Sequence, residues 1–324
     1  MKLQRILPSL LAGVATGLVM VSAQAQEVTL RAINAFQEGT YFASQFEAFV
    51  KRVNEEGKGL VKINYIGGPK AIPTMEQASA LRNGVVDLAN TTVAYTASIV
   101  PEGLALNYAT LPFAEIRKNG GLEYLNKIMQ EKGLFYLAKT GGDIGYHVYL
   151  NKKIEKADLS GLKIRISPLY RDFFAQLGAT VMQTAGGEVY TALERGVVDG
   201  YGWPTIGIFD FGWQERTKYR VDPSFYSLEL GIQFNARKWA SLTAEQRAFL
   251  EKMAQWIEEK SAADAVKDAE AELKKQAAAG IETIKLSDAE AKRFLEISQQ
   301  AGWAAVAKAS PAHGEKLRGF MTGK

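Results

Sequence analysis

The chain reads Leu81-Arg82-Asn83-Gly84-Val85-Val86-Asp87, and nearly the same pattern returns as Leu193-Glu194-Arg195-Gly196-Val197-Val198-Asp199. In each copy a helical stretch leads into the leucine, the glycine supplies a left-handed helix end, and Val-Val is predicted to open a buried strand. A repeated helix–glycine–strand unit predicts two similar α/β lobes that face each other, with a ligand-binding cleft between them. The alternative is that a common α/β connection occurs twice by chance.

Strand and helix patterns alternate on both sides of the repeat. In the first half, strands are expected at 28–34, 62–66 and 85–89, with helices at 41–54 and 73–81. In the second half, strands are expected at 146–150 and 163–166, helices at 170–177 and 188–195, and extended chain at 222–234. A long charged helix is expected at about 243–279, followed by helices within 287–309. This order is typical of largely parallel sheets.

The first 25 residues differ from the rest of the chain. Lys2 and Arg5 precede an apolar run at 6–21, and Ala23-Gln24-Ala25 has the small-x-small pattern of a signal-peptidase site. We therefore predict a signal peptide over 1–25, cleavage after Ala25 and a periplasmic mature protein. The alternative is a membrane anchor, but the run is short for a full span and no stop-transfer charges follow it.

Composition excludes several classes of function. The 324 residues are 47% hydrophobic and 23% charged, which suits a globular protein of two domains. The chain has no cysteine, so thiol catalysis and cysteine-based metal sites are excluded. A net charge of +4, without a concentrated basic patch, gives no indication of nucleic-acid binding.

No catalytic motif is present in the sequence. The two histidines, His147 and His313, are far apart, and the sequence lacks zinc-protease, nucleophile-elbow, phosphate-loop and dinucleotide-binding patterns. We therefore predict that the protein is not an enzyme, and we predict no cofactor and no metal site. The alternative is an extracytoplasmic lyase or hydrolase of small acids, whose paired carboxylates would converge in the cleft.

The expected cleft offers one cation and several aromatic rings. Arg165 lies in a short strand whose neighbours are apolar, so it either pairs with an acid of the protein or binds an anionic ligand. Tyr201 and Trp203 follow the second copy of the repeat, and Tyr95 follows the first. Such rings either pack the core or line a pocket. Trp203 lies between Gly202 and Pro204, and a turn at this point favours the cleft wall.

A string of motifs resembles a known family. The string comprises Gly161-Leu-Lys-Ile-Arg165, Leu177-Gly-Ala179, Glu188-Val-Tyr190, Gly196-Val-Val-Asp-Gly200 and Pro204, with Asp158-Leu-x-Gly161 before it, Leu111-Pro-Phe113 further upstream and Trp239-x-x-Leu242 after it. It resembles the DctP-type substrate-binding proteins of tripartite ATP-independent periplasmic (TRAP) transporters. The likeness extends over essentially the whole mature chain.

The resemblance implies an α/β fold of the two-lobe periplasmic binding protein kind (type II-like), with a long helix that spans both lobes. The first lobe is expected at 26–148 plus about 235–274, and the second at 149–234 plus about 275–324. The implied function is to capture a small organic acid by its carboxylate, with Arg165 as a bidentate partner, and to deliver it to integral-membrane transporter subunits. We expect a monomer. A sensor that reports to a membrane receptor is a further alternative.

The chain also departs from the family pattern. His147 stands where many relatives carry arginine, Tyr201-Gly202-Trp203-Pro204 replaces Gln-Glu-Asn-Pro, and Gly186-Gly187 replaces bulkier or hydroxyl residues. An indole in place of an amide predicts a less polar substrate than a sugar acid, such as a keto or hydroxy monocarboxylate or a partly aromatic acid. His147 either supplements the anion site or is a strand residue satisfied by the backbone.

The first lobe supplies the remaining candidates. They are chosen by their place at strand ends and by the family's cleft geometry. They are Phe36 and Gln37 after the first strand, and Thr92 and Tyr95 after the first copy of the repeat.

Overall fold

Both copies of the repeat adopt the same local structure in the computed structural model, which describes residues 26–323. Helices α2 (Gln77–Asn83) and α7 (Val189–Glu194) lead into left-handed glycines, Gly84 at φ 79° and Gly196 at φ 65°. In each copy the amide of the following valine donates to a carbonyl near the end of the helix. Because only glycine adopts this conformation without strain, the two helices end in the same way.

The aspartate that ends each copy fastens the chain to a neighbouring strand. The Asp87 carboxylate accepts the N–H of Arg31 at 2.8 Å, and the N–H of Asp87 donates to the Arg31 carbonyl at 2.8 Å. Asp199 repeats both contacts with Lys163, at 2.9 and 2.7 Å. The equivalence of these contacts indicates a structural repeat rather than a chance likeness.

The two valines of each copy lie before the strand, so the prediction that they open it is wrong. Val86 and Val198 are buried, whereas Val85 and Val197 are exposed. The left-handed glycine turns the chain away from the helix, and only the second valine reaches the core. The strands begin after the aspartate.

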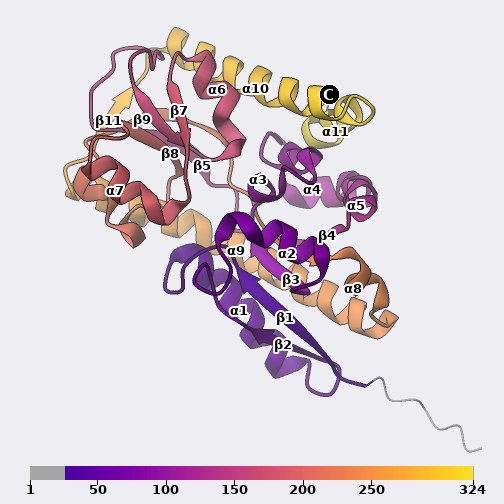
Figure 1. Ribbon diagram of the computed structural model, residues 1–324. Helices are drawn as coiled ribbons and strands as arrows, with labels where there is room; N and C mark the ends of the chain where they lie inside the picture. Colours follow the sequence, from indigo (N-terminus) through magenta and orange to yellow (C-terminus); the bar gives the residue numbers. More distant parts are fainter. Residues whose placement is uncertain (1–25, 324) are drawn as a thin grey trace, which may run out of the picture.

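The two lobes are built around two sheets of matching topology (Figure 1). The first sheet has the order β2-β1-β3-β10-β4 and the second β11-β9-β5-β8-β6-β7. The strands of the first sheet are β1 (Val28–Asn34), β2 (Val61–Tyr65), β3 (Leu88–Thr91), β4 (Leu134–Thr140) and β10 (Leu230–Asn235). Those of the second sheet are β5 (Gly145–Leu150), β6 (Lys163–Ile166), β7 (Thr180–Gln183), β8 (Gly200–Pro204), β9 (Tyr219–Ser227) and β11 (Glu282–Lys285).

Each lobe combines three adjacent parallel strands with an antiparallel pair beyond them. Strand β1 runs parallel to β2 and β3, and β10 pairs antiparallel with β3 and β4. In the same way β6 runs parallel to β7 and β8, and β5 pairs antiparallel with β8 and β9. Strand β11 extends the second sheet beside β9. The predicted two-lobe α/β fold is confirmed.

The chain crosses between the sheets twice in this region. It leaves the first sheet after β4 and enters the second at β5, so the first crossing is at 141–144. It returns between β9 and β10, at 228–229. The boundary predicted at residue 148 therefore falls inside β5, and we place the change of lobe at the two crossing segments.

Helix α9 (Ala244–Ala278) spans both lobes, as predicted (Figure 1). Its first turn is capped by Thr243, whose hydroxyl accepts the N–H of Gln246 at 3.2 Å. Near the middle of α9, Glu258 accepts a hydrogen bond from Arg117 of the first lobe at 2.5 Å. Further along, Glu272 accepts the N–H of Gly207 of the second lobe at 3.0 Å.

Shorter helices cover the remaining faces of the sheets. They are α1 (Tyr41–Glu56), α3 (Val93–Thr96), α4 (Phe113–Lys118), α5 (Gly121–Glu131), α6 (Arg171–Gln176), α8 (Ala236–Ser241), α10 (Asp288–Ala309) and α11 (Gly314–Thr322). Helix α10 packs on α6 and β9 of the second lobe and on the first-lobe segment Pro101–Leu106, and α11 packs on α5 of the first lobe. Within residues 26–323 no helix has the length and apolar character needed to span a membrane.

The first crossing segment runs in close contact with α9. Gly142 has φ 70°, and a Cβ at this position would overlap the methyl group of Ala265. Gly59 is also left-handed, at φ 81°, but a Cβ there would have nothing within 4 Å. The two glycines therefore share a backbone requirement and differ in packing.

We expect Gly142→Ala to lower the free energy of unfolding more than Gly59→Ala does. Both substitutions force a non-glycine residue into the left-handed region, at a cost of about 1–2 kcal/mol. Gly142→Ala also overpacks the contact with α9, which adds about 1–3 kcal/mol. Urea unfolding of the two variants measures the difference, and equal losses would show that the crossing segment is not tightly packed on α9.

Candidate functional site

A small pocket lies between the lobes. Residues that follow each of the two copies of the repeat in the sequence line it. Its volume is about 20 Å³, room for about one water molecule, so side chains nearly fill the space. The first lobe contributes Phe36, Phe42, Thr92, Ala94, Tyr95 and Leu230; the second contributes Tyr146, Ser167, Tyr170, Trp203 and Pro204; Leu228 comes from the second crossing. The wall is therefore mainly aromatic.

Arg165 on β6 carries a buried charge beside this pocket. Its relative exposure is 0%, and its Nε and Nη2 both donate to the Thr184 carbonyl, at 3.1 and 2.5 Å. Its Nη1 donates to the Tyr170 hydroxyl at 3.3 Å. A guanidinium has five N–H donors, so these contacts occupy three of them, and the Tyr95 hydroxyl is a further hydrogen-bonding neighbour.

No acidic side chain within residues 26–323 forms an ion pair with Arg165. An ionised group this deeply buried is normally paired with the opposite charge, since its desolvation is otherwise costly. The residue thus has the charge to receive an anion. The alternative of a structural ion pair with a protein acid finds no partner in the described chain.

Trp203 and Tyr95 lie next to the guanidinium. The Arg165 Cζ is 5.5 Å from the centre of the Trp203 ring, within the range of a cation–π contact. Burial raises the pKa of the Tyr95 hydroxyl, although the nearby charge of Arg165 opposes this rise. Tyr95 is supplied by α3, which directly follows β3, and Trp203 lies on β8.

The hydroxyls of Tyr95 and Tyr146 are available to a ligand. Burial raises the pKa of the Tyr146 hydroxyl well above its usual value, and the Tyr170 hydroxyl adds to the rise. Both phenols are therefore protonated at neutral pH. The Arg165 guanidinium is a hydrogen-bonding neighbour of the Tyr95 hydroxyl, which can accept from it and still donate its own hydrogen to a ligand.

The other first-lobe candidates occupy the rim and the edge of the pocket. The Thr92 hydroxyl caps α3 by accepting the Ala94 N–H at 3.2 Å, and it donates to the buried Glu229 carboxylate at 2.9 Å. Phe36 lies in the wall. Gln37 is exposed at the mouth, in an adjoining hollow of about 220 Å³.

Tyr201 lies behind the pocket rather than in its wall. Its hydroxyl shares a hydrogen bond of 2.7 Å with that of Thr217, and its ring stacks on Tyr149 with 5.1 Å between ring centres. Its side chain is almost completely buried. The geometry favours the alternative that this ring packs the core.

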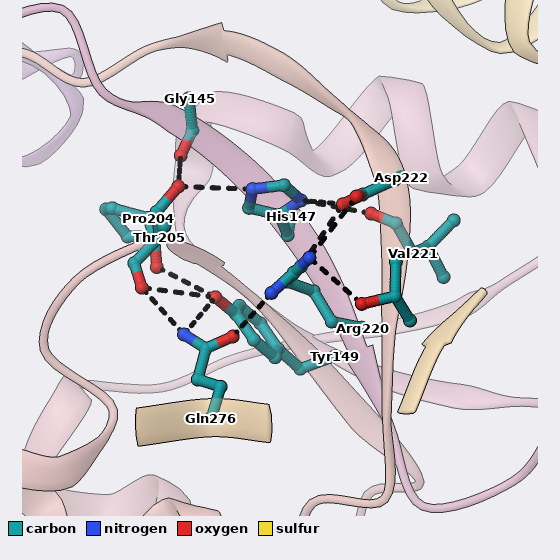
Figure 2. A network of polar contacts seen from close by, with 10 residues as sticks. Gly145, His147, Tyr149, Pro204, Thr205, Arg220, Val221, Asp222 and Gln276 are labelled. Carbon is teal, nitrogen blue, oxygen red and sulfur yellow. Dashed lines mark hydrogen bonds and ion pairs between the residues drawn. The ribbon is translucent and has the colours of Figure 1, made fainter. Parts of the chain in front are cut away.

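His147 lies in a polar network between the second sheet and α9 (Figure 2). Its Nδ1 is 3.0 Å from the Val221 carbonyl and 3.1 Å from Asp222 Oδ1, and its Nε2 is 3.1 Å from the Thr205 hydroxyl. Both ring nitrogens are engaged away from the pocket beside Arg165. This placement matches the alternative of a strand histidine satisfied by its neighbours.

The same network ties the second sheet to α9. Arg220 donates to Asp222 through Nε at 3.1 Å and to the Gln276 side chain through Nη1 at 3.0 Å. Gln276 in turn donates to the Thr205 carbonyl at 2.8 Å (Figure 2). The network therefore fixes the end of α9 to strands β5 and β9.

Several pocket residues were not among the sequence candidates. Tyr146 is one of them, and the reason is strand direction. Since β5 runs antiparallel to β8, its first residues meet the carboxyl end of β8, with Tyr146 opposite Pro204. The sequence pattern indicates a strand there but carries no signal for its direction. The other residues missed are Phe42, Ala94, Ser167, Tyr170, Pro204, Leu228 and Leu230.

A family model described as "Bacterial extracellular solute-binding protein, family 7" (DctP) matches residues 34–308. The chain belongs to the DctP family. The resemblance seen in the motif string is confirmed, and membership identifies a solute-binding receptor of the TRAP type and not an enzyme. The alternative of a lyase or hydrolase thus has no support.

Two relatives carry names of acid-binding proteins. A Nostoc "monocarboxylate 2-oxoacid-binding periplasmic protein" is 29% identical over 224 residues, 64% of this chain and 59% of that protein, which is less than two thirds of its length. The Bacillus subtilis "C4-dicarboxylate-binding protein DctB" is 28% identical over 261 residues, 76% of this chain and 73% of that protein.

Solved structures share the fold. A Bordetella pertussis extracytoplasmic solute receptor, DctP7, binding pyroglutamic acid has a TM-score of 0.80 at 18% identity, over 91% of this chain and 99% of that one. A Ralstonia eutropha TRAP periplasmic solute-binding protein with bound (S)-2-acetolactate has a TM-score of 0.77 at 20% identity, over 90% and 98%.

The network around His147 predicts an acid-dependent contribution to stability. Burial favours the neutral Asp222, but hydrogen bonds from His147 and Arg220 outweigh burial and lower the pKa of Asp222 to about 2. Because the folded-state pKa lies below the unfolded value of about 3.9, the ionised carboxylate stabilises the fold above about pH 4. This stabilisation is lost as the pH falls from 4 to 2.

We expect the free energy of unfolding of the wild type to fall by about 2 kcal/mol more than that of Asp222→Asn between pH 4 and pH 2. Denaturant unfolding at each pH measures how the free energy of unfolding of the two proteins changes with pH. The exposed Asp172→Asn is the control for loss of one carboxylate. Parallel pH profiles for the wild type and Asp222→Asn would contradict the assignment.

Proposed function

We propose that this protein captures a small organic acid by its carboxylate in the pocket between the lobes and delivers it to the integral-membrane subunits of a TRAP transporter. The observation that carries the proposal is Arg165, which is fully buried, has no acidic partner within residues 26–323 and is bonded only to a carbonyl and to tyrosine hydroxyls. The planar guanidinium matches two carboxylate oxygens and remains charged at any working pH.

The chemistry of the wall favours a monocarboxylate with an oxygen next to the carboxyl group, that is, a 2-oxo or 2-hydroxy acid. The protonated hydroxyls of Tyr95 and Tyr146 can donate to such an oxygen while Arg165 holds the carboxylate. The lining residues include no second cation to pair with another carboxylate. The name of the Nostoc relative and the acetolactate in the Ralstonia structure support this substrate class.

Ligand capture would couple to lobe closure. Tyr95 belongs to the first lobe and Arg165 to the second, so one bound acid contacts both and stabilises the closed form. The pocket of about 20 Å³ must open for entry, and movement about the crossing segments 141–144 and 228–229 would open it. We propose that the closed monomer is the form recognised by the membrane subunits, without a cofactor.

The leader segment falls outside the described residues. We propose that residues 1–25 direct export and that cleavage after Ala25 releases the mature protein into the periplasm. The intact mass of the exported protein reports the cleavage site.

Replacing Arg165 should abolish acid binding. We expect Arg165→Met to weaken the binding of pyruvate or lactate by about 3–5 kcal/mol, because the buried carboxylate loses its partner. Arg165→Lys keeps the positive charge but lacks the paired N–H donors of the guanidinium, so it should give an intermediate loss of affinity. Isothermal titration calorimetry measures both affinities.

The matched control is Arg171→Met, the same change at an exposed arginine of the same lobe. It should bind like the wild type, and circular dichroism should show that all three variants fold. Wild-type affinity in a folded Arg165→Met protein would overturn the assignment of Arg165.

The two tyrosine hydroxyls should select for the oxygen beside the carboxyl group. We expect Tyr95→Phe and Tyr146→Phe each to weaken pyruvate binding by about 1 kcal/mol while leaving propionate, which lacks that oxygen, nearly unchanged. Tyr201→Phe is the control, since its hydroxyl bonds only within the protein. Equal losses of affinity for pyruvate and propionate would show that these hydroxyls do not bind the oxygen next to the carboxyl group.

A further inference from the structure

Trp203 is fixed in place by rings from both lobes. Its ring centre lies 4.7 Å from that of Trp213 and 5.8 Å from that of Phe211, both nearly perpendicular to it. Phe42, on α1 of the first lobe, lies 5.9 Å away across the cleft. Together with the contact to Arg165, these neighbours hold the indole as a rigid wall of the pocket.

Gly186 lies against the outer edge of this indole. A Cβ on Gly186 would be 3.3 Å from Trp203 Cη2, tighter than ordinary contact. The backbone of Gly186 is not left-handed, so its conformation does not require glycine. The position of the indole therefore accounts for the missing side chain.

The neighbouring Gly187 provides the contrast. It also lacks a left-handed backbone, but a Cβ there would meet nothing within 4 Å. The two glycines are adjacent and share a backbone class, and only one of them lies against Trp203. Space is therefore limited specifically at the contact between Gly186 and the indole.

We propose that Trp203, backed by Gly186, sets the upper size limit of the ligand and restricts the pocket to short monocarboxylates such as pyruvate or lactate. The inference rests on the proposed function, because it concerns the same carboxylate site. With the indole in place, about 20 Å³ is left in the pocket beside Arg165, and Trp203 separates it from the adjoining hollow of about 220 Å³. A polyhydroxylated chain beyond the carboxyl group would have to displace a ring that four neighbours hold.

The size limit predicts a change in ligand preference. We expect the wild-type protein to bind gluconate at least about 100-fold more weakly than pyruvate. Trp203→Ala should reduce this ratio of the two affinities by about tenfold or more. Trp203→Phe keeps an aromatic wall and should narrow it less. Isothermal titration calorimetry with pyruvate and gluconate gives the ratio for each variant.

Gly186 supplies an independent test through a double-mutant cycle. Gly186→Val should push the indole into the pocket and weaken pyruvate binding by about tenfold, whereas Gly187→Val should not. In the Trp203→Ala background, Gly186→Val should have little effect on pyruvate, since the ring it displaces is gone.

The outcomes separate the inference from the proposed function. If wild-type protein binds pyruvate through Arg165 but the pyruvate-to-gluconate ratio is the same in both Trp203 variants, the size-limit inference is overturned and the proposed function stands. The size limit is also overturned, and the proposed function again stands, if Gly186→Val and Gly187→Val weaken pyruvate binding equally. If no carboxylate binds the wild type, both are overturned.

Discussion

A buried positive charge without a protein partner governs the organisation of this molecule. Arg165 is fully inaccessible, and the described chain gives it a carbonyl and tyrosine hydroxyls as partners but no carboxylate. Such a charge is tolerable where an anion completes it. The aromatic rings around it exclude water, which strengthens its attraction for a carboxylate. Arg165 belongs to the second lobe, and the first lobe supplies the opposite wall of its pocket.

The duplicated unit explains how both walls reach the same place. In each lobe an aspartate binds the neighbouring strand through two hydrogen bonds, so the following strand ends at the cleft in the same register. One copy delivers Tyr95 and the other Trp203. Similar local structure therefore carries different side chains, and the ligand chemistry resides in those few differences.

The ranges of single helices and strands could be predicted from the sequence, whereas strand pairing and contacts between distant segments could not. The ranges of β1, β6 and α9 follow from alternation, helical periodicity and the capping Thr243, all of which depend on nearby residues. The strand direction of β5, and hence the role of Tyr146, depends on pairing with β8, which lies far along the chain. His147 was a candidate because of its position in the motif, yet its contacts come from β9 and the loop after β8.

Strand β10 lies between β3 and β4, although it comes from the chain that returns after the second crossing. The first sheet is thus completed by an inner strand, β10, which comes after strands β5 to β9 in the chain. During synthesis β4 has no neighbour in its sheet until residues 230–235 are available. The first lobe therefore cannot finish folding before most of the second lobe has been made, and cooperative folding of the whole chain follows from the order of its strands.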